Sequence, residues 1–175
     1  MKKYIGFLFS LLMSMLIIAI VAIWQGLYSF VFAWTLNFML MLSGLSMTRT
    51  FKPRLTSDYF NSKKWENEGK IYKCFGINIF RALLVWVGWE KLNKATNPVK
   101  KHFNALKHLE YSTRESEFGH LVIFFIVLSI AVFVGFYYGF TKSLWLHILN
   151  VILHVYPIAT QRYNRPRLQK VINKE

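Results

Sequence analysis

The sequence lacks most of the features on which soluble enzymes and metal-binding domains depend. It has a single cysteine, Cys74, which excludes an intramolecular disulfide and a metal site built from cysteines. It contains no Walker loop, no GxGxxG, no GxSxG and no HExxH. Acidic residues are also few, because 8 Asp and Glu stand against 22 Lys and Arg, giving a formal net charge of +14. No nucleic-acid-binding motif accompanies this charge, so we expect no nucleic-acid partner. The single cysteine and the missing motifs lead us to expect no metal and no tightly bound cofactor.

Charged residues are missing altogether from long stretches of the chain. Residues 4–47 contain no Asp, Glu, Lys, Arg or His, which is enough for two spans of roughly 20 residues each. Residues 121–140 form a third apolar stretch, and residues 144–160 form a fourth that includes His147, Asn150 and His154. The pattern predicts an all-α, polytopic membrane bundle in a single membrane domain, with four transmembrane helices near residues 5–24, 28–47, 120–140 and 143–160.

The basic residues indicate the orientation of these spans. Lys2 and Lys3 precede the first span, basic residues follow the second and fourth, and Lys142 alone lies in a short turn. Cytoplasmic segments carry the excess of Lys and Arg in such proteins. We therefore expect a multi-pass membrane protein with both termini and residues 48–119 in the cytoplasm. The Met-Lys-Lys start resembles a signal peptide, but its apolar stretch is too long, so we expect an uncleaved anchor.

The cytoplasmic connection of residues 48–119 is far longer than a turn requires, which favours a functional role. Residues 65–72 predict a short helix, and residues 99–111 predict a basic amphipathic helix. Residues 75–89 are apolar but too few to span, so we expect an interfacial or re-entrant helix there. The Ser-x-x-Glu pattern of residues 112–115 has the form of a capping box and predicts that a helix starts at Thr113.

Glu117 and His120 are the first candidates for chemistry, because three residues of helix place them on one face where the third span begins. An imidazole can take a proton from a hydroxyl while a neighbouring carboxylate orients it, which suits acyl transfer to an alcohol. A surface Glu–His pair at a helix start is the common alternative at this spacing. A zinc site is a weaker one, because further ligands would be needed.

Polar residues continue along the fourth span and into the tail. His147, Asn150, His154 and Gln161 recur on one helix face, and they indicate either a buried site or hydrogen bonding to other helices, for example to Asn37 or Thr35. The segment from Gln161 to Arg167 then brings arginines to the membrane boundary, where a guanidinium binds phosphate bidentately. Positive-inside anchoring is the alternative. Pro166 is expected to stop the helix.

Five short motifs occur in a fixed order: Trp65-Glu66-x-x-Gly69-Lys70-x-Tyr72, Gly76-Ile77-x-x-Phe80-Arg81, Glu117-x-x-His120, Tyr156-Pro157 and Gln161-Arg162-Tyr163-Asn164-Arg165-Pro166-Arg167. Together they resemble the glycosyl-4,4'-diaponeurosporenoate acyltransferase family of bacterial membrane proteins, over roughly residues 50–170. The resemblance implies an enzyme that places a fatty acyl chain on the sugar of a glycosylated carotenoid acid, the last step of staphyloxanthin synthesis.

The resulting hypothesis is a membrane O-acyltransferase in which His120 is the general base and Glu117 orients it. Arg162 and Arg165, with Arg81, would bind the phosphates of acyl-CoA or a similar donor, or stabilise the oxyanion. Gln161, Tyr163 and Asn164 would hold sugar hydroxyls, His154 would share the site, and one cavity would contain Glu117, His120, Arg162 and Asn164. The partners would be membrane lipids and a lipidic glycosylated acceptor. Two alternatives are a membrane methyltransferase that uses S-adenosylmethionine, and a non-catalytic subunit that binds anionic lipid or a partner protein.

Overall fold

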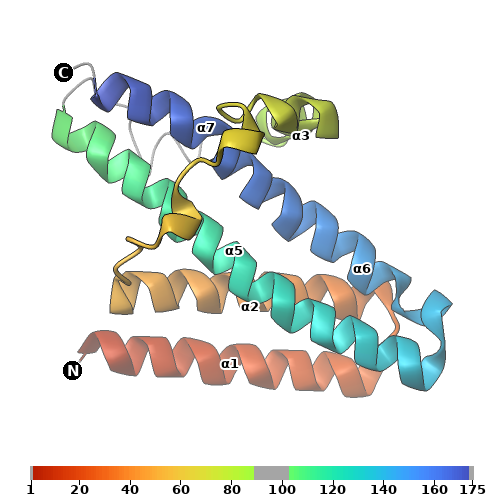
Figure 1. Ribbon diagram of the computed structural model, residues 1–175. Coiled ribbons are helices and arrows are strands. Elements are labelled where there is room, and N and C mark those ends of the chain that lie inside the picture. The colour runs from red at the N-terminus through yellow and green to blue at the C-terminus, as the bar shows by residue number, and fades with distance from the viewer. Residues whose placement is uncertain (1, 89–102, 174–175) are drawn as a thin grey trace. The chain divides into compact units, whose positions relative to one another are not determined.

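The structure, a computed structural model, describes residues 2–88 and 103–173, with Lys2 described by its backbone alone. Four helices within these residues are long and apolar enough to cross a membrane, which confirms the predicted all-α membrane bundle. The bounds are α1 Lys2–Gln25, α2 Phe30–Phe51, α5 Phe103–Tyr138, and a fourth stretch of η4 Phe140–Ser143, α6 Leu144–Asn150, η5 Val151–Val155 and α7 Tyr156–Ile172 (Figure 1). Within the fourth stretch, η5 is a π-helical turn.

The chain forms two compact units. The first, the membrane unit, contains residues 1–54 and 118–155, which include α1, α2, the second part of α5, α6 and η5. In it α1 and α2 lie antiparallel and side by side (Figure 1). Its core is made of apolar residues from α2, α5 and α6: Phe32, Ala33, Leu36, Ile123, Val127, Ala131, Val134, Leu146 and Leu149. The α5 members recur every three or four residues, so a single face of that helix packs inward.

The second, the motif unit, contains residues 55–117 and 156–175. It includes the 3-10 turns η1 Asp58–Phe60, η2 Lys64–Glu66 and η3 Lys70–Phe75, the helix α3 Ile77–Trp86, the first part of α5, and α7. With 10 residues, α3 is about 15 Å long, about half the thickness of the hydrocarbon core. It is therefore too short to cross. Residue 89 and residues 99–102, at the edges of the predicted helices, lie outside the described residues.

Three predictions about local structure were wrong: a helix at residues 65–72, a helix start at Thr113 and a helix end at Pro166. The expected helix at residues 65–72 is divided into η2 and η3, because Asn67, Glu68 and Gly69 adopt φ values of 46°, 54° and 81°. No helix starts at Thr113, since α5 already begins at Phe103 and no Gly or Pro interrupts it before Gly119. The Thr113 hydroxyl donates to the Glu110 carbonyl of the preceding turn at 2.6 Å, as a residue inside a helix can.

Pro166 does not stop the last helix, because α7 continues to Ile172. An internal proline removes one backbone hydrogen bond and crowds the preceding turn, which costs about 3 kcal/mol or more. The residues around Pro166 offset that cost, since Arg162 and Arg165 bind the rest of the motif unit and Arg167 donates to the Tyr163 carbonyl. Tertiary contacts thus override a local helix-breaking signal.

Candidate functional site

Glu117 lies at the centre of an ionic cluster in the motif unit. Its side chain is fully buried on α5, and each carboxylate oxygen accepts from a different arginine of α7. Arg162 Nε donates to Oε1 at 2.7 Å, and Arg165 Nη2 donates to Oε2 at 2.5 Å. Hydrogen bonds between ionised groups of this kind are about twice as strong as neutral ones. One carboxylate therefore joins two turns of α7 to α5.

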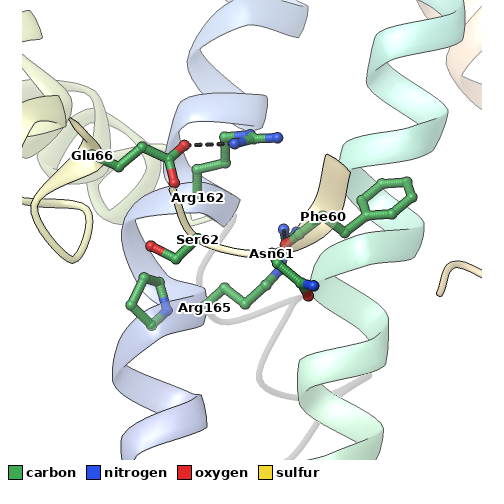
Figure 2. A pocket seen from close by; sticks show the side chains of 7 residues that line it. Phe60, Asn61, Ser62, Glu66, Arg162 and Arg165 are labelled. Carbon is green, nitrogen blue, oxygen red and sulfur yellow. Dashed lines mark hydrogen bonds and ion pairs between the residues drawn. The ribbon is translucent and has the colours of Figure 1, made fainter. Parts of the chain in front are cut away.

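The two arginines use their remaining nitrogens on the segment that contains η1 and η2 and, in one case, on Thr113 of α5. Arg162 donates to Glu66 Oε1 at 2.5 Å and to the Tyr59 carbonyl at 2.7 Å; Figure 2 shows the Glu66 bond. Arg165 donates to the Phe60 carbonyl at 2.6 Å and to Thr113 Oγ1 at 2.9 Å. Every guanidinium nitrogen of both residues thus has an acceptor within the protein.

Glu66 supplies the second carboxylate, so two negative and two positive charges meet. It is 1% exposed and also accepts from the Lys63 backbone N–H at 2.7 Å and from the Tyr72 hydroxyl at 2.6 Å. Burial opposes ionisation of Glu66, but the bonds from Tyr72, Lys63 and Arg162 outweigh it and hold its pKa below the ordinary value. Burial and the bond to Glu66 raise the pKa of Tyr72, which keeps its hydroxyl protonated as a donor.

Little space remains around this cluster. The hollow beside it is too narrow for a water molecule, and its lining comes from η1, η2 and α7: Phe60, Asn61, Ser62, Glu66, Arg162, Arg165 and Pro166 (Figure 2). Arg165 is 2% exposed. We therefore interpret Arg162 and Arg165 as internal ties that hold the 59–66 segment against α5 and α7, while their role in donor binding stays a prediction.

The other candidates in α7 lie nearer the surface. Gln161 donates to Ser116 at 3.3 Å, and the partly exposed side chain of Asn164 has no hydrogen-bond partner within residues 2–88 and 103–173. The buried ring of Tyr163 contacts two exposed guanidinium groups, those of Arg81 at 5.5 Å and Arg167 at 3.7 Å from its centroid. Unlike Arg162 and Arg165, these two arginines have no carboxylate partner among the described residues.

The glycine and aromatic residues of the motifs explain how the motif unit packs. Gly69 has φ +81°, and a Cβ there would lie 3.0 Å from the Arg162 carbonyl oxygen and from Tyr163 Cα. The Arg162 carbonyl is the one that Pro166, without an N–H, cannot bind. On α3, Phe80 stacks on Tyr156 of α7 with centroids 5.1 Å apart. The motifs therefore pack against one another.

His120 and His154 come together in the membrane unit. Their Nδ1 atoms are 3.1 Å apart, and His154 Nε2 lies 2.8 Å from Asn37 Oδ1 on α2. The Asn37 amide nitrogen donates to the Ala33 carbonyl at 2.7 Å, which fixes the amide so that its oxygen faces His154. His154 and Asn37 are fully buried, and His154 lies in the π-helical turn η5, a feature that is frequent at functional sites.

These contacts determine which ring nitrogens carry protons. Because Asn37 Oδ1 only accepts, His154 Nε2 carries its proton and a neutral His154 accepts at Nδ1. His120 then donates from Nδ1, and in the neutral ring its Nε2 keeps a lone pair. The result is a hydrogen-bonded chain, Asn37–His154–His120, which we call the histidine relay. A histidine oriented in this way can act as a base.

The family model of the glycosyl-4,4'-diaponeurosporenoate acyltransferases matches residues 56–174. The chain belongs to this family. The match makes it a member of a group of acyltransferases in carotenoid biosynthesis and includes every candidate site residue that the sequence pointed to. No curated protein and no solved structure matches the chain.

The structure groups the candidates of this family member differently from the prediction. Glu117 was expected to orient His120, whereas the partners that the structure describes are the two arginines for Glu117 and His154 for His120. The expected alternative of hydrogen bonding between helices holds for His154, which binds Asn37, and for Asn150, which donates to the Phe124 carbonyl. The single cavity of Glu117, His120, Arg162 and Asn164 involves both units and stays a prediction.

Sequence reasoning gave no role to several residues that the structure places in these networks. Glu66 and Tyr72 were noted as parts of a family motif, and Thr113 was taken for the first residue of a helix. An acidic residue in a strongly basic connection is a usable signal for Glu66, because it needs a cationic partner if it is buried. The Tyr59 and Phe60 carbonyls give no sequence signal, since backbone acceptors are present at every residue.

Proposed function

We propose that this protein is an integral-membrane O-acyltransferase of the bacterial inner membrane, working at the cytoplasmic face. It would transfer a fatty acyl group from acyl-CoA, or a similar acyl donor, to a hydroxyl of a glycosylated lipid or carotenoid. Family membership supports acyl transfer. The observation that carries the catalytic assignment is the histidine relay, because it leaves His120 Nε2 unprotonated.

In the proposed reaction, His120 Nε2 takes the proton of the acceptor hydroxyl as its oxygen attacks the thioester carbonyl carbon. The new C–O bond forms an ester, the C–S bond breaks, and the leaving thiolate takes the proton back from His120. The products are the acylated acceptor and the free thiol. His154 accepts from His120 and donates to Asn37, so it holds the base in the required tautomer, as the orienting residue of a catalytic triad does.

The donor side of the proposal uses the exposed arginines. Arg81 and Arg167 stack on Tyr163 and keep their guanidinium groups at the surface, so they suit the phosphates of coenzyme A. Asn164 and Gln161 remain the candidates for sugar hydroxyls. Glu117, Arg162 and Arg165 act as positioning residues, because their charges are already engaged within the motif unit.

The test is an acyl-transfer assay with purified protein in lipid nanodiscs. Labelled palmitoyl-CoA is supplied with the glycosylated carotenoid acid, and ester formation is followed by mass spectrometry. His120→Ala should lower kcat by about 100-fold or more, since general-base catalysis contributes about 10²–10⁴. The control is His147→Ala, which removes a histidine that contacts Phe140 and has no place in the relay.

Wild-type turnover by His120→Ala would remove His120 from the mechanism. Methyl transfer from S-adenosylmethionine, without ester formation, would show the methyltransferase alternative instead. Absence of both reactions with all supplied donors, in protein that is correctly folded, would favour the non-catalytic subunit.

A further inference from the structure

The membrane unit contains a groove between α1 and α2 that has no part in the proposed acyl transfer. Its volume is about 490 Å³, and its lining comes from both helices: Lys3, Gly6, Phe7, Leu42, Leu45, Ser46, Arg49 and Thr50. Sites for small ligands have volumes of about 300–1,000 Å³. All of these residues precede the segment matched by the family model, residues 56–174, so the groove is not part of what the family match covers.

One part of the groove is apolar and open. A Cβ added at Gly6 would meet nothing within 4 Å, so the backbone of α1 is accessible there. Leu42 and Leu45 on α2 are 54% and 49% exposed and form the opposite wall. Phe7 contributes a further apolar surface, and its ring lies edge-on to Phe51 at 5.4 Å, which holds it in place. A hydrocarbon chain fits these surroundings.

The other part of the groove is cationic. Lys3 and Arg49 are both exposed, and the hydroxyl residues Ser46 and Thr50 lie beside them. The sequence has no Asp or Glu before Asp58 and none between residues 118 and 155, so the membrane unit has no carboxylate of its own. Two cations that face an apolar groove can therefore pair only with an anion from outside the unit.

We propose that this groove binds one anionic phospholipid. The phosphate lies between Lys3 and Arg49, and one acyl chain lies along Gly6, Leu42 and Leu45. A phospholipid matches the groove in both respects, because it joins an anion to a hydrocarbon chain and is present in the surrounding membrane. A phospholipid with net negative charge is favoured over a zwitterionic one, since no acidic residue of the unit offsets the two cations.

Native mass spectrometry of the whole protein in detergent tests this proposal. Phosphatidylglycerol or phosphatidylcholine is titrated in, and the number of retained lipids is counted. The wild type should retain one phosphatidylglycerol with higher affinity than phosphatidylcholine. Lys3→Gln with Arg49→Gln should raise the Kd for phosphatidylglycerol by roughly 30-fold, since each basic residue near a membrane surface is worth about 1 kcal/mol. Lys142→Gln removes one charge near Tyr28, outside the groove, and should leave the Kd unchanged.

A second pair of variants tests the shape of the groove without changing its charge. Gly6→Leu fills the apolar part and should abolish retention, whereas Leu8→Trp adds bulk to α1 outside the lining and should not. Equal retention of both lipids, or phosphatidylglycerol binding unchanged in Gly6→Leu, would show non-specific annular lipid and overturn the proposal. Circular dichroism and gel filtration check folding. If Gly6→Leu is misfolded, the result for the two exposed basic residues decides.

Discussion

At the scale of single residues, the stability of the fold depends on the buried carboxylate of Glu117 and its two arginine partners. A buried carboxylate bound to two guanidinium groups is stable only while the charges stay together. In Glu117→Gln, the amide nitrogen cannot accept from an arginine, so one buried guanidinium nitrogen loses its acceptor and both arginines lose the negative charge of Glu117. We expect the free energy of unfolding to fall by about 3–5 kcal/mol, the usual cost of breaking a buried ion pair. Unfolding in detergent by titration with sodium dodecyl sulfate measures this change.

The control for that experiment is Glu110→Gln. Glu110 pairs with Arg114 one helical turn away on the same helix and also accepts from Gln169, and its side chain is 15% exposed whereas that of Glu117 is fully buried, so Glu110→Gln should cost less stability. A loss at Glu117 no larger than the loss at Glu110 would contradict the structural role of the cluster.

Glu66 predicts a pH dependence of stability. Because the folded state lowers its pKa below the ordinary value of 4.5, the protein gains stability from Glu66 above that pH. The gain is lost as the pH falls from about 4.5 through the folded pKa. Unfolding titrations between pH 7 and pH 3 should therefore show a decline that is smaller in Glu66→Gln. Glu68→Gln alters an exposed pair with Lys170, which also lowers the pKa of Glu68, but solvent screens that pair, so this variant should reduce the decline less than Glu66→Gln does.

Arg81 tests the proposed donor site. Its guanidinium is exposed and contacts only the Tyr163 ring among the described residues, so Arg81→Gln should leave the fold intact. If Arg81 binds donor phosphate before the reaction, Arg81→Gln should raise the KM for acyl-CoA about tenfold and change kcat little. A tenfold rise corresponds to the loss of about one charge-assisted hydrogen bond. A fall in kcat at unchanged KM would assign Arg81 to the transition state instead. The same assay with Lys107→Gln controls for the loss of one positive charge.

The candidate residues were predictable by type, and their partners were not. His120, His154, Glu117 and the α7 arginines stand out because ionisable residues beside or within apolar spans are costly unless they have a role. The sequence could not show that Glu117 binds two arginines, because these contacts join residues 45 and 48 positions apart. Spacing along one helix favoured the Glu117–His120 pair, and tertiary packing supplied other partners for both.

At the scale of elements, the packing of Gly69 against α7 gives a sharp comparison. Gly69→Ala combines a φ of +81° with a Cβ only 3.0 Å from backbone atoms of α7. Gly88→Ala has the same φ of +81°, but its Cβ would meet nothing within 4 Å. Both should be destabilising, and Gly69→Ala should cost about 1–3 kcal/mol more, the usual cost of overpacking. Equal losses in the detergent unfolding assay would show that η3 and α7 do not pack closely.

The elements themselves were predictable where the signal was long. Stretches of apolar residues identified all four spans, since a membrane-spanning helix satisfies its own backbone hydrogen bonds. Local signals were less reliable. The capping-box pattern at Thr113 and the proline at position 166 both predicted helix ends, yet α5 and α7 continue through them. In each case contacts of the motif unit stabilise the longer helix, and a local pattern carries no information on such contacts.

At the scale of the whole molecule, the family match covers two of the four spans of the described residues and leaves out the other two. The family match begins at residue 56, whereas α1 and α2 both precede it. Nevertheless, α2 supplies Asn37, which holds the relay histidine His154. The proposed chemistry therefore depends on a helix outside the matched segment. Replacement of α2 by an unrelated span would preserve membrane insertion and remove the residue that fixes the tautomer of His154.

The final prediction concerns the topology of the chain. Residues 2–88 and 103–173 contain an even number of spans, and Lys and Arg gather beyond the outer ends of both hairpins, so both termini should lie in the cytoplasm. The helix α3, with 10 residues, is too short to add a fifth crossing. A reporter fused after Lys174 should therefore lie on the cytoplasmic side, and one inserted at Lys142 should lie on the opposite side.

A third reporter at Ser62, in the connection before α3, should lie on the same side as the one after Lys174. If the reporters at Ser62 and Lys174 lay on opposite sides, an odd number of crossings would separate them and the motifs at residues 65–72 and 161–167 would face different compartments. That outcome would exclude the ionic bonds between Glu66 and Arg162, so the topology experiment also tests the motif unit.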